Sequence, residues 1–194
     1  MMGKIYVIMG KSAAGKDTVY GEVKALLPSL RGFVMYTTRP KRSGEEDGVS
    51  YHFVTPGFVE EAEKNGTLIE KRVYDTVYGP WIYATIDDGQ IDLSEGDYLV
   101  PGTLESYLRL RDHFGSDTVI PVYIEVEDGE RLLRAIGREK AQKTPRYAEM
   151  CRRFLADCED FSEEKLAEAG IERRFENRDA GLCASMIADM IRGN

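Results

Sequence analysis

The chain is short of cysteine and histidine, and this shortage argues against a disulfide-stabilised protein and against a metal site built from these residues. Its 194 residues include three cysteines, too few and too scattered for a disulfide framework. No two of them form a CxxC pair, and the two histidines, His52 and His113, lack the spacing of metal ligands. We interpret Cys151 and Cys158, which share a helical stretch, as small buried apolar residues.

Long apolar runs and an excess of basic residues are also missing. No stretch approaches the roughly 18 apolar residues of a membrane-spanning helix, and the run from Ile5 to Met9 is too short for a signal peptide. We therefore expect a cytoplasmic protein with no membrane partner. Lys and Arg total 26 against 34 Asp and Glu, and the net charge of −8 argues against a nucleic-acid partner. A local arginine cluster can still bind an anionic ligand.

The N-terminal segment has the pattern of an α/β protein. Ile5 to Met9 is a continuous apolar run rich in β-forming residues, typical of a strand buried on both faces. A glycine-containing turn follows, and then a helical pattern from Lys16 to Leu27 that Pro28 ends. This order predicts a parallel sheet flanked by helices. We expect further strands at 98–100 and 119–126, and a closing helix near 182–191 with one apolar face formed by Leu182, Met186, Ile187 and Met190.

The texture of the sequence changes in two places within what we expect to be a single domain, 1–194. Between 36 and 90, short β-like pieces alternate with Gly- and Pro-containing turns, which indicates a small mixed α/β insertion. From 137 to 161 the chain is highly charged and helical, as expected for a solvated, mobile segment. The core would consist of 1–35, 91–136 and 162–194.

The turn after the first strand fits a phosphate-binding loop. Residues 10–18 read GKSAAGKDT and match G-x-x-x-x-G-K. Glycines let successive N–H groups point at phosphate oxygens, and the following helix adds its partial positive charge. Lys16 then reaches the β- and γ-phosphates. We predict an ATP site formed by Gly10, Ser12, Ala13, Ala14, Gly15, Lys16, Asp17 and Thr18.

One position of this loop departs from the usual pattern. Asp17 stands where a hydroxyl normally binds Mg²⁺, and Thr18 follows it. Because hard cations favour carboxylate ligands, we expect Asp17 to hold Mg²⁺ directly or through water. Mg²⁺ would enter with ATP as the cofactor.

A cluster of cations follows further along the chain. Arg39, Lys41 and Arg42 stand within four residues, ahead of Tyr51. An arginine fork and a tyrosine hydroxyl suit a highly charged oxyanion. Taken alone, the cluster also fits a solvated basic loop. Beside an ATP-type loop it indicates a second phosphate site, because phosphoryl transfer needs an acceptor as well as a donor.

Four stretches of the sequence carry a resemblance to a known family. They are the phosphate loop, TTRPKRSGEEDGVSYHFV at 37–54, LIE at 68–70 and Tyr78-Gly79. Together they resemble the guanylate kinase family, and the resemblance covers nearly the whole chain. The resemblance implies a P-loop core, a monophosphate-binding insertion and a lid, with ATP and GMP converted to ADP and GDP. By match to the family motifs, the GMP phosphate would be held by Arg39, Arg42, Tyr51 and Tyr78.

Glu70 would read guanine by the same resemblance. Guanine presents N1–H and an exocyclic amine side by side, and a carboxylate offers two acceptors in matching geometry. Adenine has no such donor pair, so Glu70 would discriminate against AMP. The alternative is an exposed strand glutamate with no role in binding.

The resemblance also implies a lid that carries arginines. Arg138 and Arg153 would close over the transferring phosphoryl group, because such transfer depends on positioning and charge stabilisation. Rival arginines for these roles are Arg134, Arg146 and Arg152. Asn177 resembles the family's asparagine near the adenine, and no general base is assigned.

Two departures from the family pattern leave alternatives open. Pro80 stands where the family has Ser or Thr, and residues 98–102 lack the two aspartates of the family's central strand. Thr103 or Glu105 could compensate for the missing aspartates from the start of the following helix, and Asp17 could replace the aspartate near the metal. The alternatives are a related P-loop kinase with another phosphorylated acceptor, and a guanylate-kinase-like binding module without catalysis. The intact loop, with Lys16 and both glycines, favours an enzyme.

Overall fold

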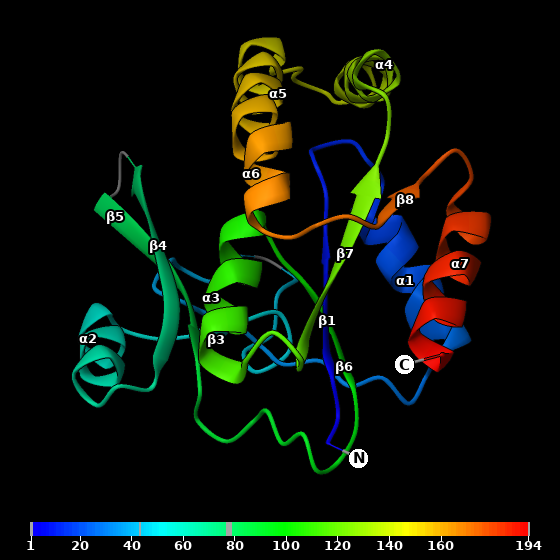
Figure 1. Cartoon of the computed structure of the whole chain (residues 1–194). Coiled ribbons are helices and arrows are strands. Elements are labelled where there is room, and N and C mark those ends of the chain that lie inside the picture. Colours follow the sequence, from blue (N-terminus) through cyan, green and yellow to red (C-terminus); the bar gives the residue numbers. More distant parts are fainter. Residues whose placement is uncertain (1, 43, 77–78, 194) are drawn as a thin grey trace.

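The computed structural model describes residues 2–42, 44–76 and 79–193, which form two sheets (Figure 1). The first sheet has the order β6-β1-β7-β8, and all its neighbouring strands are parallel. Its strands are β1 (Ile5–Met9), β6 (Tyr98–Pro101), β7 (Val119–Glu125) and β8 (Arg174–Glu176). The parallel sheet flanked by helices that the sequence predicts is confirmed.

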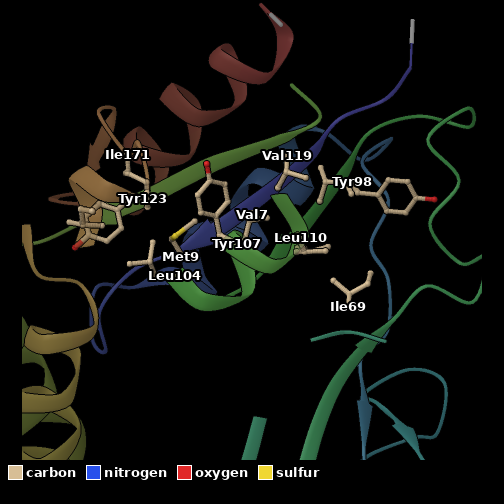
Figure 2. Packing of buried hydrophobic residues seen from close by; sticks show 14 of the residues in the cluster. Val7, Met9, Ile69, Tyr98, Leu104, Tyr107, Leu110, Val119, Tyr123 and Ile171 are labelled. Atoms are coloured by element: carbon tan, nitrogen blue, oxygen red, sulfur yellow. The ribbon is translucent and has the colours of Figure 1, made fainter. Parts of the chain in front are cut away.

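Helices cover both faces of this sheet, and β1 is buried between them. The helices are α1 (Lys16–Leu26) and α7 (Ala180–Arg192) on one face, and α3 (Leu104–Phe114) and α6 (Glu163–Glu168) on the other. Because successive strand side chains alternate in direction, Tyr6 and Ile8 pack against the first pair of helices. Val7 and Met9 lie among Leu104, Tyr107 and Leu110 of α3 (Figure 2). Burial from both sides explains the uninterrupted apolar run.

The second sheet lies beside α3, on the side away from β7 (Figure 1). Its order is β3-β2-β5-β4, with one parallel and two antiparallel pairings. Its strands are β2 (Tyr36–Thr37), β3 (His52–Phe53), β4 (Leu68–Thr76) and β5 (Gly79–Ile86), and α2 (Pro56–Lys64) packs against them. The segment is mixed α/β, and its two longest strands, β4 and β5, pair antiparallel along most of their length.

Two further helices, α4 (Asp128–Lys140) and α5 (Tyr147–Asp160), stand beyond the carboxyl end of the core strands. Figure 1 shows them next to the loop that joins β1 to α1. The predicted charged helical segment therefore corresponds to the end of α4 and the whole of α5. Within the described part of the chain, no helix has both the length and the apolar character needed to cross a bilayer.

Two predictions about buried faces are wrong in part, although Ile187 is buried and Met190 packs against the core as predicted. In α7, Leu182 and Met186 are 70% and 52% exposed. The buried face is instead formed by Cys183, Ala184, Ile187, Ala188 and Ile191. Cys183, Ala184 and Ala188 are small, and their size lets α7 lie close to α1. Cys151 is exposed and Cys158 only half-buried, because α5 packs along one side only.

Candidate active site

The phosphate loop is shaped by residues that tolerate unusual backbone geometry or close packing. Ala13 and Gly15 adopt left-handed conformations, with φ of 64° and 82°. A Cβ on Gly10 would lie 2.6 Å from the carbonyl oxygen of Ile124 in β7, so only glycine fits there. No described side chain caps the N-terminus of α1. The first N–H groups of the helix are therefore free to bind an anion.

Asn177 supports this loop from behind. Its side chain is buried, and Nδ2 donates to the carbonyl of Ala14 at 2.7 Å. Its backbone N–H donates to the carbonyl of Glu125, at the end of β7, at 2.8 Å. Asn177 thus connects the loop to the core sheet and lies outside the cleft wall. This contact points to a role in holding the loop, and a direct contact with ATP stays a prediction.

A cleft of about 1020 Å³ opens in front of the loop. It brings together Lys16 with Arg138 of α4 and Arg153 of α5, the three residues for which the sequence predicts a catalytic role. The guanidinium of Arg138, in α4, has no hydrogen bond or ion pair among the described residues. Arg153 donates through Nε to Glu149 at 2.8 Å. The other wall of the cleft comes from β4, α3 and α6.

The rival arginines occupy different places. Arg134 also lines the cleft, but it pairs with Glu130 and donates to the carbonyl of Asn177. Arg152 points both its Nε and Nη2 at Glu149 and lies outside the cleft. Hydrogen bonds from Arg152, and then Arg153, lower the pKa of the Glu149 carboxyl to about 2. Arg146 lines a neighbouring cavity of about 450 Å³ between α4 and α5.

Carboxylates also reach the cleft near the loop. The Asp17 side chain is 93% exposed, and its Oδ1 lies 2.7 Å from Lys16 Nζ. Glu105, in the first turn of α3, lines the same cleft. Thr103 lies there too, but its Oγ1 caps α3 by accepting the N–H of Ser106 at 3.2 Å. Of Thr103 and Glu105, which could both compensate for the missing strand aspartates, Glu105 thus has the freer side chain.

The basic loop is organised around a buried arginine. Arg39 is 4% exposed, and its Nη1 and Nη2 donate to the two carboxylate oxygens of Glu45 at 2.7 and 2.5 Å. Its Nε donates to Tyr83 at 3.0 Å, and its guanidinium lies 5.1 Å from the centre of the Tyr51 ring. The hydrogen bonds from Arg39 lower the pKa of Glu45 to about 2, and the pair raises the pKa of Arg39. The basic loop is therefore held in a defined conformation by buried contacts, and the alternative of a solvated basic loop does not describe Arg39.

Arg42 and Tyr51 have different surroundings from Arg39. The Arg42 side chain is exposed, and its guanidinium has no hydrogen bond or ion pair among the described residues. Burial raises the pKa of Tyr51, so its hydroxyl stays a neutral donor. Tyr78, the remaining predicted phosphate ligand, lies outside the described residues.

Glu70 is buried on β4, which rules out an exposed strand glutamate. Ser106 Oγ lies 3.0 Å from both carboxylate oxygens, and Thr85 Oγ1 donates to Oε1 at 3.1 Å. A carboxylate offers about four lone-pair positions. Two hydroxyl donors therefore leave capacity for two more, the number that guanine presents.

Comparison with known proteins identifies the family. A sequence model of guanylate kinase matches residues 2–92. The guanylate kinase of Syntrophotalea carbinolica is 31% identical over 158 residues, which cover 80% of this chain and 73% of that protein. The chain belongs to the guanylate kinase family. The resemblance inferred from the motifs is thereby confirmed.

Two further relatives extend the likeness to the whole length. The guanylate kinase of Chromobacterium violaceum is 29% identical over 209 residues, which cover 98% of this chain and 94% of that one. A crystal structure of guanylate kinase from Anaplasma phagocytophilum shares the fold, with a TM-score of 0.67 at 18% identity. That match covers 99% of this chain and 86% of the other.

Within this guanylate kinase fold, sequence reasoning missed Arg131. Its side chain is fully buried, and Nε and Nη2 donate to Asp128 Oδ1 at 2.9 and 2.7 Å. Its Nη1 donates to the Ser12 carbonyl at 3.0 Å. Asp157 of α5 accepts the Ser12 N–H at 2.7 Å, and the guanidinium lies over Phe154 at 4.6 Å. Arg131 thus joins α4 and α5 to the phosphate loop.

No local signal could have singled out Arg131. It stands in the charged run ERLLRAIGREK, where an arginine is ordinarily solvated. Its importance comes from Ser12 and Asp157, which are distant in the sequence and become neighbours only in the fold.

Proposed function

We propose that this chain transfers the γ-phosphoryl group of ATP to GMP and releases ADP and GDP. One observation supports the proposal above the others: an intact phosphate loop, Arg138 and Arg153 line one cleft in a chain of the guanylate kinase family. Phosphoryl transfer needs a held donor, a held acceptor and positive charge between them.

The donor side is the loop itself. We propose that ATP binds along Gly10 and residues 12–18, with Lys16 on the β- and γ-phosphates. The uncapped N–H groups of α1 supply dipolar stabilisation of the phosphates. Lys16 would exchange its contact with Asp17 for these oxygens.

The lid supplies the charge for the transfer. Arg138 already faces the cleft without a partner among the described residues, and Arg153 is held only through Nε by Glu149. Their guanidinium groups would neutralise charge on the phosphoryl group as it moves between two in-line oxygens. No proton-transfer residue is required for this role.

The acceptor side is the basic loop and β4. We propose that Arg42, Tyr51 and Tyr78 bind the GMP phosphate, and that Glu70 accepts from N1–H and the 2-amino group. Four of the five N–H groups of Arg39 are already engaged by Glu45, Tyr83 and the Pro40 carbonyl, so Arg39 has one N–H left to offer the phosphate. Residues 36–90 thus serve as the acceptor-binding insertion and 137–161 as the lid.

The acids in the cleft fit Mg²⁺. No group of three or more His, Cys, Asp or Glu residues suited to a metal occurs in the described part of the chain. Mg²⁺ needs no such cage, since one or two carboxylates with phosphates and water suffice. Asp17, with Glu105 nearby, would hold the ion. When bound, Mg²⁺ supplies positive charge against the β- and γ-phosphates.

The reaction belongs to purine nucleotide metabolism, and we place it in the cytoplasm, where ATP is supplied.

A coupled assay of ADP release tests the proposal. ATP and Mg²⁺ are offered with GMP, AMP, CMP or UMP, and we expect turnover with GMP at least about 100-fold above that with AMP. Turnover restricted to another monophosphate, or none with any of them, would contradict it.

A further inference from the structure

Arg72 lies in the cleft on the same face of β4 as Glu70. Residues two apart on a strand point the same way, and Arg72 and Tyr74 both line the cleft. Tyr83 of β5 stands opposite Arg72 in the hairpin. The side chain is 20% exposed, so the guanidinium faces both the buried carboxylate and the open cleft.

The contacts of this guanidinium are incomplete. Its Nη2 lies 3.6 Å from Glu70 Oε1, an ion pair beyond ordinary hydrogen-bond length. Its Nε is buried and has no hydrogen-bond partner among the described residues. A buried donor left without a partner is costly, and such groups in native proteins usually meet a water or a ligand. Nε itself is enclosed, but the whole guanidinium lacks a hydrogen bond among the described residues and lines the cleft, so its Nη groups are available to a molecule there.

We propose that Arg72 is a specificity-determining residue that donates to O6 and N7 of the acceptor's guanine base. The inference rests on GMP as the acceptor. An arginine fork matches these two guanine acceptors in bidentate fashion. Glu70 accepts from N1–H and the 2-amino group, so the two neighbouring side chains read adjoining edges of one base.

The sequence of the pocket explains why such a donor is needed here. Pro80 supplies neither a hydroxyl nor a backbone N–H. Pro80 stands on β5, which pairs with β4. Arg72 lies on β4 and can therefore supply the missing donors from the neighbouring strand. Adenine would turn its 6-amino group toward the guanidinium, donor against donor. Arg72 therefore rejects AMP at the position where Glu70 also leaves adenine unpaired.

The test combines a variant with a substrate analogue. Steady-state kinetics with GMP and 7-deaza-GMP, which lacks the N7 acceptor, are measured for wild type, Arg72→Met and Arg72→Lys. Lys71→Met is the matched control, because Lys71 is the next residue on β4 and pairs outside the cleft with Glu63. Far-UV circular dichroism checks folding, and Arg72→Lys keeps the comparison available if the methionine variant misfolds.

We expect Arg72→Met to raise the KM for GMP by about 10- to 100-fold and to leave the KM for ATP unchanged. The wild type should bind 7-deaza-GMP less well than GMP, and this penalty should vanish in Arg72→Met and shrink in Arg72→Lys. Lys71→Met should match the wild type.

Two results overturn the inference while GMP turnover persists. One is an unchanged KM for GMP in Arg72→Met. The other is a raised KM with the full 7-deaza penalty retained, which would assign Arg72 to the acceptor phosphate. Absence of GMP turnover in the wild type is a different failure, since it overturns the proposed function and the inference with it.

Discussion

Arg39 and Arg42 are three residues apart, yet their surroundings assign them different tasks. Arg39 is buried and donates to Glu45 and Tyr83, so its guanidinium mainly stabilises the conformation of the loop. Arg42 is exposed and contacts Glu45 through its backbone: its N–H donates to Glu45 Oε2 at 2.8 Å, and its carbonyl accepts the Glu45 N–H at 3.2 Å. The unpaired guanidinium is the one available to an incoming phosphate.

Removing the Arg42 side chain should therefore weaken GMP binding selectively. A charge-assisted hydrogen bond contributes about 1.5–3 kcal/mol, so Arg42→Ala should raise the KM for GMP by roughly 10- to 100-fold. The KM for ATP should stay unchanged, and Tyr51→Phe should act in the same direction more weakly. Lys41→Ala, at an exposed neighbour, is the control. Equal effects on both substrates would show that the loop is no dedicated acceptor site.

Asp17 allows a test of the proposed metal site at the level of one atom. Asp17→Ser restores the family's usual hydroxyl ligand, whereas Asp17→Asn keeps the size and loses the charge. Because hard cations favour anionic oxygens, Asp17→Asn should require more Mg²⁺ for half-maximal activity than Asp17→Ser. Activity measured against Mg²⁺ concentration decides between them. Two curves that overlay the wild type would leave Asp17 as a solvated residue of the first helical turn.

At the scale of elements, local sequence patterns predicted the strands, loops and helices whose structure depends on residues close together in the sequence. The apolar run at 5–9 and the GKSAAGKDT motif define β1, the loop and α1 without any distant residue. Contacts between distant segments were beyond such patterns. Ser106 reaches Glu70 from α3, and Arg131 reaches Ser12 from α4. Both use ordinary polar residues that have no sequence signature.

The face of α7 shows a second limit. Leu182 and Met186 are more hydrophobic than Ala184 and Ala188, yet the alanines are inside. Which face a helix buries depends on how closely its neighbour approaches, and that distance is a property of the packed pair α1 and α7.

The junction between α4, α5 and the phosphate loop depends on Arg131. In Arg131→Met, Asp157 and the Ser12 carbonyl lose their cationic partner in a mostly buried place. We expect a loss of about 1–3 kcal/mol in the free energy of unfolding, together with a raised KM for ATP. Urea denaturation and steady-state kinetics measure the two effects. Arg109→Met, at an exposed position of α3, should change neither. Unaltered stability and KM in Arg131→Met would refute a positioning role.

At the scale of the whole molecule, elements attached to both sheets line one cleft. The parallel sheet ends in the phosphate loop, and the mixed sheet presents β4 to the same cleft of about 1020 Å³. Helices α4 and α5 stand over the loop with Arg138 and Arg153 (Figure 1). This arrangement supports the proposed direct transfer, in which the bound donor and acceptor must share one space.

Direct observation of the products tests this account most simply. ATP, Mg²⁺ and GMP are incubated with the protein, and ADP and GDP are followed by ³¹P nuclear magnetic resonance. We predict that both diphosphates form in equal amounts, and that Lys16→Ala, with an unchanged circular dichroism spectrum, lowers the rate by about 100-fold or more. ADP without GDP, or Lys16→Ala turning over at the wild-type rate, would contradict the account.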